Sequence, residues 1–242
     1  GAEGGKDVRA LVINAGCANA FTGKAGADAA RRTASEVAKR FGCRQRDVML
    51  ASTGVIGVVL DDKKITARLP EVEAGLKADA WAQAGLGIMT TDTRPKGASC
   101  QIELDGHTVT ISGISKGAGM IRPNMATMLG FIATDARIAP ELLQTLASEL
   151  GEKSFNRITI DGDTSTNDAC MLMASGQYSG PEITASSAAL PKLREALQAI
   201  YLELAHAIVR DGEGATKFVT IDVSGAAGQQ EALDVAYTVA HS

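Results

Sequence analysis

Thr127 is the residue whose type and surroundings point most directly to chemistry. It follows a small residue, Ala126, and precedes an apolar run. A threonine hydroxyl is a weak nucleophile until a base activates it. A threonine at the start of a chain carries its own base, an α-amino group with a pKa of ~7.7–8.0. Thr127 could therefore act without histidine if the chain were cut before it, although Ala-Thr before an apolar run also fits an ordinary strand start.

An acidic cluster, Asp161-Gly-Asp163-Thr-Ser165, follows an apolar run and allows three interpretations. A calcium loop fails, because Thr166 stands where an EF-hand needs glycine and Leu172 where it needs glutamate. An aspartyl-nucleophile phosphatase would need a later acidic magnesium-binding pair, for which Arg210–Glu213 is a poor match. The remaining interpretation is a turn capped by its own side chains, with a helix beginning near Asn167-Asp168.

Other motif classes are absent or weak in the sequence. There is no GxxxxGK[ST] phosphate loop, no HExxH zinc motif and no CxxC pair. We interpret the glycine-rich stretch Gly113–Gly119 as a tightly turning loop, and Cys170 as a core residue of an apolar helix.

The composition excludes several classes of protein. The chain has 242 residues, 24 Lys and Arg against 28 Asp and Glu, and 4% aromatic residues, so neither charge nor stacking surfaces favour nucleic-acid binding. No apolar stretch is long enough for a membrane helix, and residues 1–7 do not resemble a secretion signal. The four dispersed cysteines then predict reduced thiols and a cytoplasmic protein. Because no methionine starts the chain, we also expect it to be part of a longer protein.

The sequence pattern predicts alternating strands and helices, which favours an α/β fold of layered sheets and helices in one large or two small domains. Helices are expected at 26–41, closed by Gly42, and at 61–77, 140–150, 191–209 and 231–240. Strands are expected at 9–13, 48–51, 87–90, 100–103, 107–111, 129–133, 157–160 and 218–222, with Asp105-Gly106 as a hairpin turn. Polar clusters follow several strands, which is where open α/β sheets place their ligands.

Six sequence blocks, in order and over nearly the whole chain, resemble the ornithine acetyltransferase family of arginine biosynthesis, the ArgJ proteins. Lys116-Gly-Ala-Gly-Met-Ile-Arg-Pro-Asn-Met-Ala-Thr127-Met-Leu is similar to the family's self-cleavage site. The other blocks are Leu11–Gly23, Ala51–Gly57, Met89–Lys96, Ser154–Asp168 and Ile208–Lys217.

This resemblance implies a fold of layered sheets and helices of the ornithine acetyltransferase and DmpA-like type, with the logic of an N-terminal-nucleophile hydrolase. The scissile bond would be Ala126–Thr127, giving an alpha portion, 1–126, and a beta portion, 127–242, which would lack the family's C-terminal region. The two portions would associate as a hetero-oligomer, with a heterotetramer expected.

The resemblance further implies transfer of an acetyl group from N2-acetylornithine to glutamate through acetyl-Thr127, with ping-pong kinetics. Thr53 and Gly54 would stabilise the oxyanion, and Thr91, Lys116 and Glu213 would contact substrate. Lys116 would pair with a carboxylate and Glu213 with the ornithine ammonium, and no cofactor or metal would be needed. Two alternatives stay open: a related self-processing aminopeptidase or amidohydrolase, and an inactive fragment.

Overall fold

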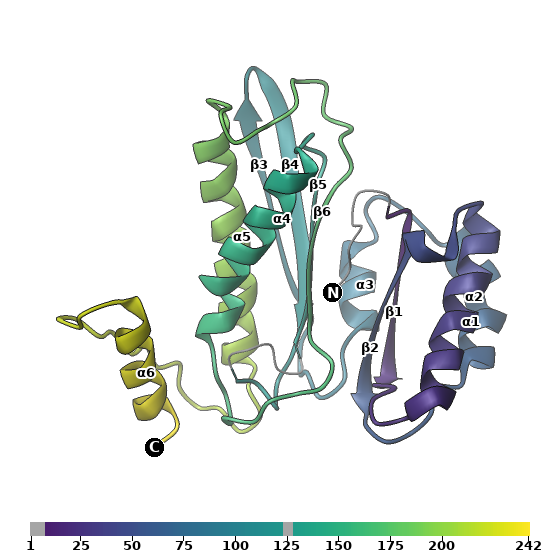
Figure 1. Cartoon of the computed structure of the whole chain (residues 1–242), viewed down its shortest axis with the longest axis horizontal. Helices are drawn as coiled ribbons and strands as arrows, with labels where there is room; N and C mark the ends of the chain where they lie inside the picture. Colours follow the sequence, from purple (N-terminus) through teal and green to yellow (C-terminus); the bar gives the residue numbers. More distant parts are fainter. Residues whose placement is uncertain (1–7, 123–127) are drawn as a thin grey trace.

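The computed structural model describes residues 8–122 and 128–242, which form two β-sheets between two layers of helices (Figure 1). Helices α1 and α2 cover a two-stranded sheet, and helices α4 and α5 cover a four-stranded sheet. The uncovered faces of the two sheets meet in an apolar cluster of their own. This arrangement confirms the predicted α/β fold of layered sheets and helices.

The first sheet pairs β1 (Ala10–Cys17) with β2 (Val48–Val55) in parallel. The crossover between them contains α1 (Gly23–Phe41) and a short 3-10 helix, η2 (Gln45–Asp47). Helix α1 ends at Gly42, whose φ of 61° is the left-handed cap expected there. Helix α2 (Asp62–Ala74) follows β2 and packs beside α1, where Val37, Val48 and Leu69 share a core.

The second sheet has the strand order β3-β4-β5-β6. Strands β3 (Lys96–Leu104) and β4 (His107–Lys116) form the predicted hairpin, with Asp105 and Gly106 at positive φ in its turn. Strand β5 (Leu129–Thr134) is antiparallel to β4 and parallel to β6 (Ala169–Ala174). Between β5 and β6 lie α4 (Pro140–Glu152) and a 3-10 helix, η3 (Phe155–Arg157).

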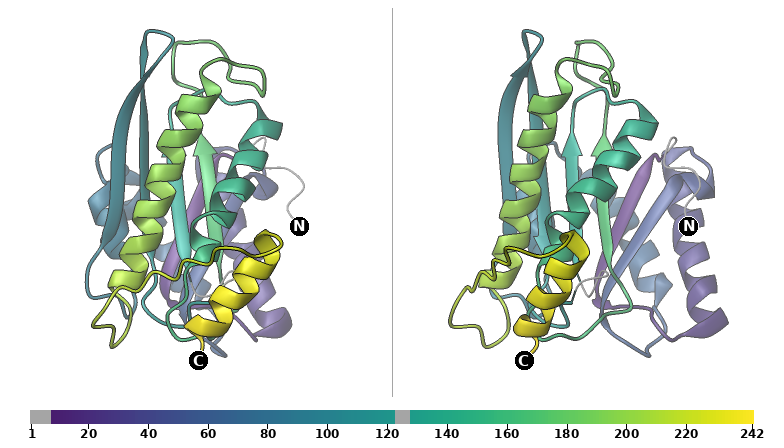
Figure 2. Two further views of the ribbon diagram at one scale, coloured as in Figure 1. Left: turned by 90° about the vertical axis from the view of Figure 1, so that its left-hand side faces the viewer. Right: turned by 60° about the vertical axis from the view of Figure 1, so that its left-hand side comes forward.

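Alternation along these strands separates two cores. Even-numbered residues of β5, such as Ile132, face α4 and α5 (Leu190–Arg210), which lie side by side on this face (Figure 2). Odd-numbered residues, such as Leu129 and Phe131, face the first sheet. Helix α3 (Trp81–Gly87) packs against β4 at the edge of this second core, near Ile114.

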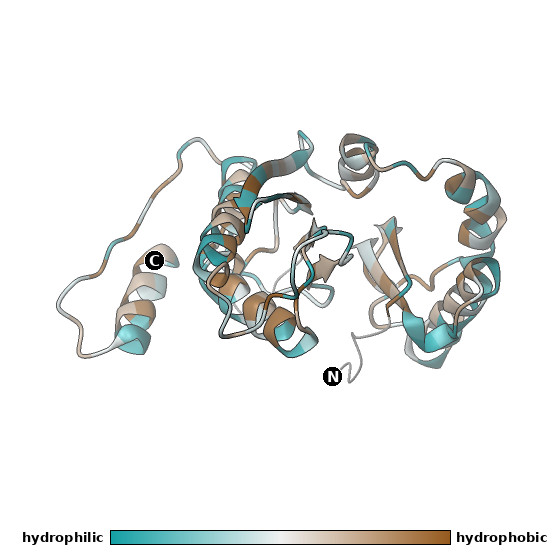
Figure 3. Ribbon diagram, turned by 90° about the horizontal axis from the view of Figure 1, so that it is seen from above, coloured by the Kyte–Doolittle hydropathy of each residue, from teal (hydrophilic) through white to brown (hydrophobic). Residues whose placement is uncertain are grey.

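Helix α6 (Gln229–Ala240) lies apart from the layers at the end of a long extended segment (Figure 3). None of its residues is buried, and it is tied to the rest by a hydrogen bond of 2.5 Å from Tyr237 Oη to Asn156 O. Within residues 8–122 and 128–242, we find no helix with the length and hydropathy that a bilayer span requires.

Three strand predictions are wrong. Gly87 ends α3 and residues 88–90 follow it as a loop, residues 157–160 begin in η3, and residues 218–222 are extended without a strand partner in the described chain. Apolar, β-branched residues favour strands only when a neighbouring edge pairs with them, and Val219 of the third segment is instead 70% exposed.

Two further predictions are wrong around the glycine-rich and acidic segments. Asn167-Asp168 leads into strand β6, so Cys170 lies in a strand and not in a helix. Gly113–Lys116 belongs to β4 rather than to a turn. This stretch also has the spacing of a G-x-S-x-G nucleophile motif, but Ser115 is buried within the sheet, and its hydroxyl donates to Leu204 O over 3.4 Å. It therefore lacks the strand-to-helix turn of a nucleophile elbow.

Candidate functional site

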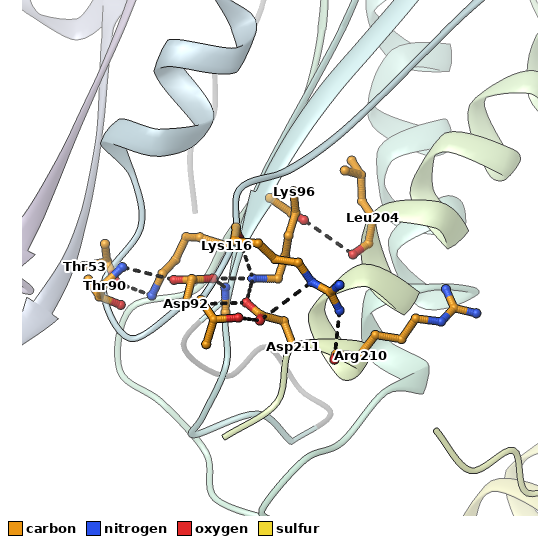
Figure 4. A network of polar contacts seen from close by, with 12 residues as sticks. Thr53, Thr90, Asp92, Lys96, Lys116, Leu204, Arg210 and Asp211 are labelled. Atoms are coloured by element: carbon orange, nitrogen blue, oxygen red, sulfur yellow. Dashed lines mark hydrogen bonds and ion pairs between the residues drawn. The ribbon is translucent and has the colours of Figure 1, made fainter. Parts of the chain in front are cut away.

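Lys116 and Thr53, both predicted site residues, meet between the two sheets. Lys116 ends β4 and points to the same side as Ile114, toward the first sheet. Its side-chain Nζ donates a hydrogen bond of 3.0 Å to Thr53 Oγ1 on β2 (Figure 4). Lys116 is 2% exposed and Thr53 fully buried. The fold thus brings together two polar residues that lie 63 positions apart in the sequence.

The environment of Lys116 lowers the pKa of its side-chain ammonium. Burial lowers the pKa of the ammonium, and the nearby Lys96 charge lowers it further, while the carboxylates of Asp92, Asp168 and Glu213 oppose this shift. An ammonium has three N–H donors, and among the described residues only Thr53 accepts one from Lys116. The two remaining donors could bind an anionic group of a ligand.

Gly54 follows Thr53 on β2 and pairs with Gly16 of β1. Its φ is 125°, and a Cβ atom there would lie 2.3 Å from the carbonyl carbon of Gly16. Only glycine fits both the backbone conformation and this close approach. Gly54 is half-buried inside strand β2, in register with Gly16 of β1, and the oxyanion role of Thr53 and Gly54 stays a prediction.

A buried ion network that the sequence did not reveal lies behind Lys116 (Figure 4). The Lys96 ammonium lies 2.6 Å from Asp92 Oδ1 and 2.5 Å from Asp211 Oδ2. All three side chains are at most 2% exposed. Burial acts to raise the pKa of both carboxyls, but hydrogen bonds from Lys96 and from backbone and hydroxyl donors lower it below the usual range.

This network fixes two loops of the candidate site. Asp92 also accepts hydrogen bonds from the backbone nitrogens of Gly117, at 2.7 Å, and Thr90, at 3.0 Å. Asp211 accepts hydrogen bonds from the backbone and hydroxyl of Thr93. Thr91, the predicted substrate residue between them, is exposed. Its loop is therefore held in place from both sides, while Gly117 anchors the residue after Lys116.

Glu213 lies on a third loop, beside the segment that follows Lys116. Its backbone nitrogen donates to Ala118 O over 2.6 Å. A Cβ atom on Gly119 would lie 2.9 Å from the Glu213 carboxyl group, so this glycine makes room for it. Glu213 is exposed, and its charge contributes to the pKa of Lys116. The structure thus places the two predicted residues of opposite charge in one neighbourhood.

Asp168, which the sequence analysis placed at the start of a helix and gave no role in the site, also adjoins this region. Its Oδ1 accepts a hydrogen bond of 2.7 Å from Met128 N. Oδ2 is buried, and no donor in the described residues reaches it. Burial raises the pKa of this carboxyl to about 7, against the effects of the Met128 hydrogen bond and the Lys116 charge. Ala126 and Thr127, the predicted cleavage site and nucleophile, lie outside the described residues.

The contacts of the acidic cluster Asp161-Gly-Asp163-Thr-Ser165 do not support a metal or phosphate site. Asp161 accepts hydrogen bonds from the backbone nitrogens of Met120, Ile121 and Asp163, so its oxygens brace a loop. In the parts of the chain that the structure describes, no group of three or more His, Cys, Asp or Glu side chains could hold a metal ion.

Comparison with known proteins identifies the family. The model of the ArgJ family matches residues 2–242. The chain belongs to the ArgJ family. It is 62% identical, over its whole length, to the "Arginine biosynthesis bifunctional protein ArgJ" of Caulobacter vibrioides, of which it covers 60%. It is 56% identical over 97% of its length to the protein of the same name from Pseudomonas syringae pv. tomato, of which it covers 58%. The chain therefore spans about 60% of the length of these relatives.

Two solved structures are also similar to this ArgJ chain. The crystal structure of the ArgJ protein from Bacillus halodurans matches 48% of this chain and 61% of its own, with 39% identity and a TM-score of 0.42. An l-aminopeptidase d-ala-esterase/amidase from Ochrobactrum anthropi matches 77% of this chain and 63% of its own, with 14% identity and a TM-score of 0.44. The family assignment depends on the sequence matches and not on these partial superpositions.

Proposed function

We propose that this protein is an acyltransferase of arginine biosynthesis that moves an acetyl group from N2-acetylornithine to glutamate. The observation that carries the proposal is that this chain is 62% identical, over all of its 242 residues, to a protein named for arginine biosynthesis. The meeting of Lys116, Thr53 and Glu213 supports it, because a buried cation and a carboxylate suit substrates that carry both charges. The reaction as proposed uses no metal or cofactor.

The first step in this proposal is cleavage of the chain before Thr127. The Thr127 hydroxyl attacks the Ala126 carbonyl, and water hydrolyses the resulting ester. This step produces the portions 1–126 and 127–242 and a free amino group on Thr127. Strands β4 and β5, one from each portion, pair in register with Lys116 opposite Leu129, so the products would share one sheet.

Acetyl transfer then proceeds in two halves. The Thr127 hydroxyl takes the acetyl group from N2-acetylornithine, and the glutamate amine later attacks the acetyl-Thr127 ester. Each half passes through an oxyanion, which Thr53 and Gly54 would stabilise; one such donor contributes about 2.7–4 kcal/mol. Lys116 would bind a substrate carboxylate, Glu213 the ornithine ammonium, and Thr91 a polar group of the substrate. Covalent storage of the acetyl group predicts ping-pong kinetics.

Mass spectrometry of the complete protein tests this function. We expect two chains that separate under denaturing conditions, and a gain of one acetyl group on Thr127 after incubation with N2-acetylornithine. Thr127→Ala should abolish both, whereas Thr108→Ala, which changes an exposed threonine of the β3–β4 hairpin, should change neither. An unbroken wild-type chain that gains no acetyl group would refute the proposal. Hydrolysis of small peptides without acetylation by acetylornithine would favour the aminopeptidase alternative.

We further propose that the two portions stay together as an alpha/beta hetero-oligomer, with a heterotetramer as the expected form, in the cytoplasm. Helix α5, from the second portion, packs against β3 and β4 of the first. Separation would therefore expose the core between α5 and the sheet. The four cysteines are free thiols, as a reducing compartment requires. Light scattering of the cleaved protein gives its mass, and dissociation into portions under native conditions would contradict this arrangement.

A further inference from the structure

Lys96, which begins β3, and Lys116, which ends β4, are both buried, but their hydrogen bonds differ. The Lys96 ammonium has an acceptor for each of its three N–H donors. These acceptors are Asp92 Oδ1 at 2.6 Å, Asp211 Oδ2 at 2.5 Å and Arg94 O at 3.4 Å. The Lys116 ammonium has one acceptor among the described residues. Lys96 is therefore a satisfied structural cation, whereas Lys116 keeps donors for a ligand.

Asp92 links this satisfied network to Lys116 in two ways. Its side chain is fully buried, and it accepts the Gly117 N–H over 2.7 Å, which fixes the chain directly after Lys116. Its charge also acts on Lys116: burial lowers the pKa of that ammonium, and Asp92 is the charge that opposes this most strongly. A backbone contact and an electrostatic effect thus both lead from Asp92 to Lys116.

The charges of the network do not balance. Lys96 carries one positive charge, whereas Asp92 and Asp211 are both ionised, because hydrogen bonds hold their pKa values below the usual range despite burial. Arg94 lies 3.8 Å from Asp211, but its side chain is 59% exposed, so water screens its charge. One negative charge is left without a buried counterion. Among the described residues, Lys116 is the other buried lysine or arginine besides Lys96.

We propose that Asp92 is the positioning residue of Lys116: it fixes the backbone beside this lysine and supplies the buried negative charge that the substrate-binding ammonium faces. This inference rests on the proposed function, in which Lys116 binds a substrate carboxylate. That carboxylate is present only in the complex, so the free site needs a charge of its own to keep Lys116 protonated. Thr90, Gly117 and Lys96 already donate to the two oxygens of Asp92, so it acts through Lys116 and not on substrate.

This arrangement determines how substrate binding depends on pH. Lys116 attracts a carboxylate only while it is protonated, so kcat/KM for N2-acetylornithine should fall as the pH rises through the pKa of Lys116. Removing the charge of Asp92 lowers this pKa and moves the fall to lower pH. The other charged groups that act on Lys116 stay in place in that variant: Lys96, Asp168 and Glu213.

The test is the pH profile of acetyl transfer by the complete protein and by Asp92→Asn, from about pH 6 to 10, below the ordinary lysine pKa of about 10.4. Asparagine Oδ1 can still accept from Gly117 N and Lys96, so the substitution removes mainly the charge. We expect the descending limb of kcat/KM to move to lower pH. At pH 8 the KM should rise about 10-fold, with a smaller change in kcat, because a binding contact is weakened. Asp92→Glu, which restores the charge, should return the limb toward its original position.

The matched control is Asp211→Asn. This variant removes the other carboxylate that binds Lys96, which is also buried, but Asp211 is not among the charges that act most strongly on Lys116. Both variants should lose stability to urea, but only Asp92→Asn should move the limb. An unmoved limb in Asp92→Asn, or an equal movement in Asp211→Asn, would overturn the inference.

A 13C NMR titration of the wild type needs no variant of Asp92. With lysine labelled at Cε, and with the Lys116 signal identified by its loss in Lys116→Arg, we expect Lys116 to be protonated at pH 7. A neutral Lys116 at pH 7 would overturn the inference, even if Asp92→Asn does not fold. If the wild-type protein transfers no acetyl group, the proposed function itself fails, and the titration of Lys116 in the wild type and in Asp92→Asn still decides whether Asp92 controls its charge.

Discussion

Removing the buried cation Lys96 should destabilise the protein strongly and in a pH-dependent way. In Lys96→Met, the carboxylates of Asp92 and Asp211 lose the ammonium that lies 2.6 and 2.5 Å from them, and all three side chains are at most 2% exposed. Breaking a buried ion pair by removing one partner costs about 3–5 kcal/mol, because an uncompensated charge stays buried. We expect a loss in this range in the free energy of unfolding at pH 7.

The sign of the pH dependence follows from the pKa shifts. In the wild type, the pKa values of Asp92 and Asp211 are lowered, so their contribution is full above the unfolded value of about 3.9 and is lost as the pH falls through the folded values. In Lys96→Met, burial without the ammonium should raise both pKa values above the ordinary one. The variant then recovers stability relative to the wild type as the pH falls from 7 toward about 4.

Urea denaturation followed by circular dichroism at several pH values measures this difference. Lys153→Met is the matched control, because Lys153 and Glu149 form an ion pair of 2.7 Å whose side chains are 54% and 25% exposed. Such a pair contributes about 0–1 kcal/mol. If Lys96→Met costs no more than Lys153→Met, or if its cost does not change with pH, the reasoning about the network is wrong.

Three further predictions concern stability and thiol reactivity. Gly54→Ala should cost at least about 3 kcal/mol, from a φ of 125° and a Cβ placed 2.3 Å from the carbonyl carbon of Gly16; an unchanged urea midpoint would contradict the close approach. Leu197→Ala removes a fully buried side chain of α5 and should cost about 2–5 kcal/mol by the same assay, whereas a loss below about 1 kcal/mol would argue against the packing of α5 on the sheet. The Cys170 side chain packs against the same core although the residue is only partly buried, and burial raises the pKa of its thiol to about 12. Mass spectrometry should therefore find Cys170 modified by a thiol reagent at pH 8 more slowly than Cys17 in the folded protein, and equal rates would contradict its burial.

Local signals in the sequence were sufficient to predict the structure where one or two residues determine the backbone conformation. Gly42 ends α1 in the left-handed conformation, Asp105 and Gly106 turn the β3–β4 hairpin, and Pro140 begins α4. Each of these residues either favours or tolerates a conformation that others avoid. Such preferences act within a few residues, so they can be recognised without knowing the rest of the fold.

The sequence was insufficient where the structure depends on strand pairing or on contacts between residues far apart in the chain. The six apolar residues of β6 (Ala169–Ala174) can form a strand or a buried helix, and only the parallel partner β5 selects the strand. Residues 218–222 show the converse, a strand-like composition without a partner in the described chain. The same limit applies to the candidate site. Resemblance marked Lys116, Thr53 and Glu213, but nothing local connects Lys96 to Asp211, which lies 115 positions away.

The buried network has its clearest significance across the proposed cleavage point. Lys96 and Asp92 precede Thr127, whereas Asp211 follows it, so the ion pair of Lys96 and Asp211 would join the two portions after cleavage. Buried charges contribute little net stability compared with apolar residues of similar size, but they penalise every arrangement that leaves them unpaired. Because Asp92 also holds Gly117, and Asp211 is two residues from Glu213, the correct pairing fixes the relative position of the loops after Lys116 and around Glu213. The network therefore explains how two separate chains could preserve one site geometry.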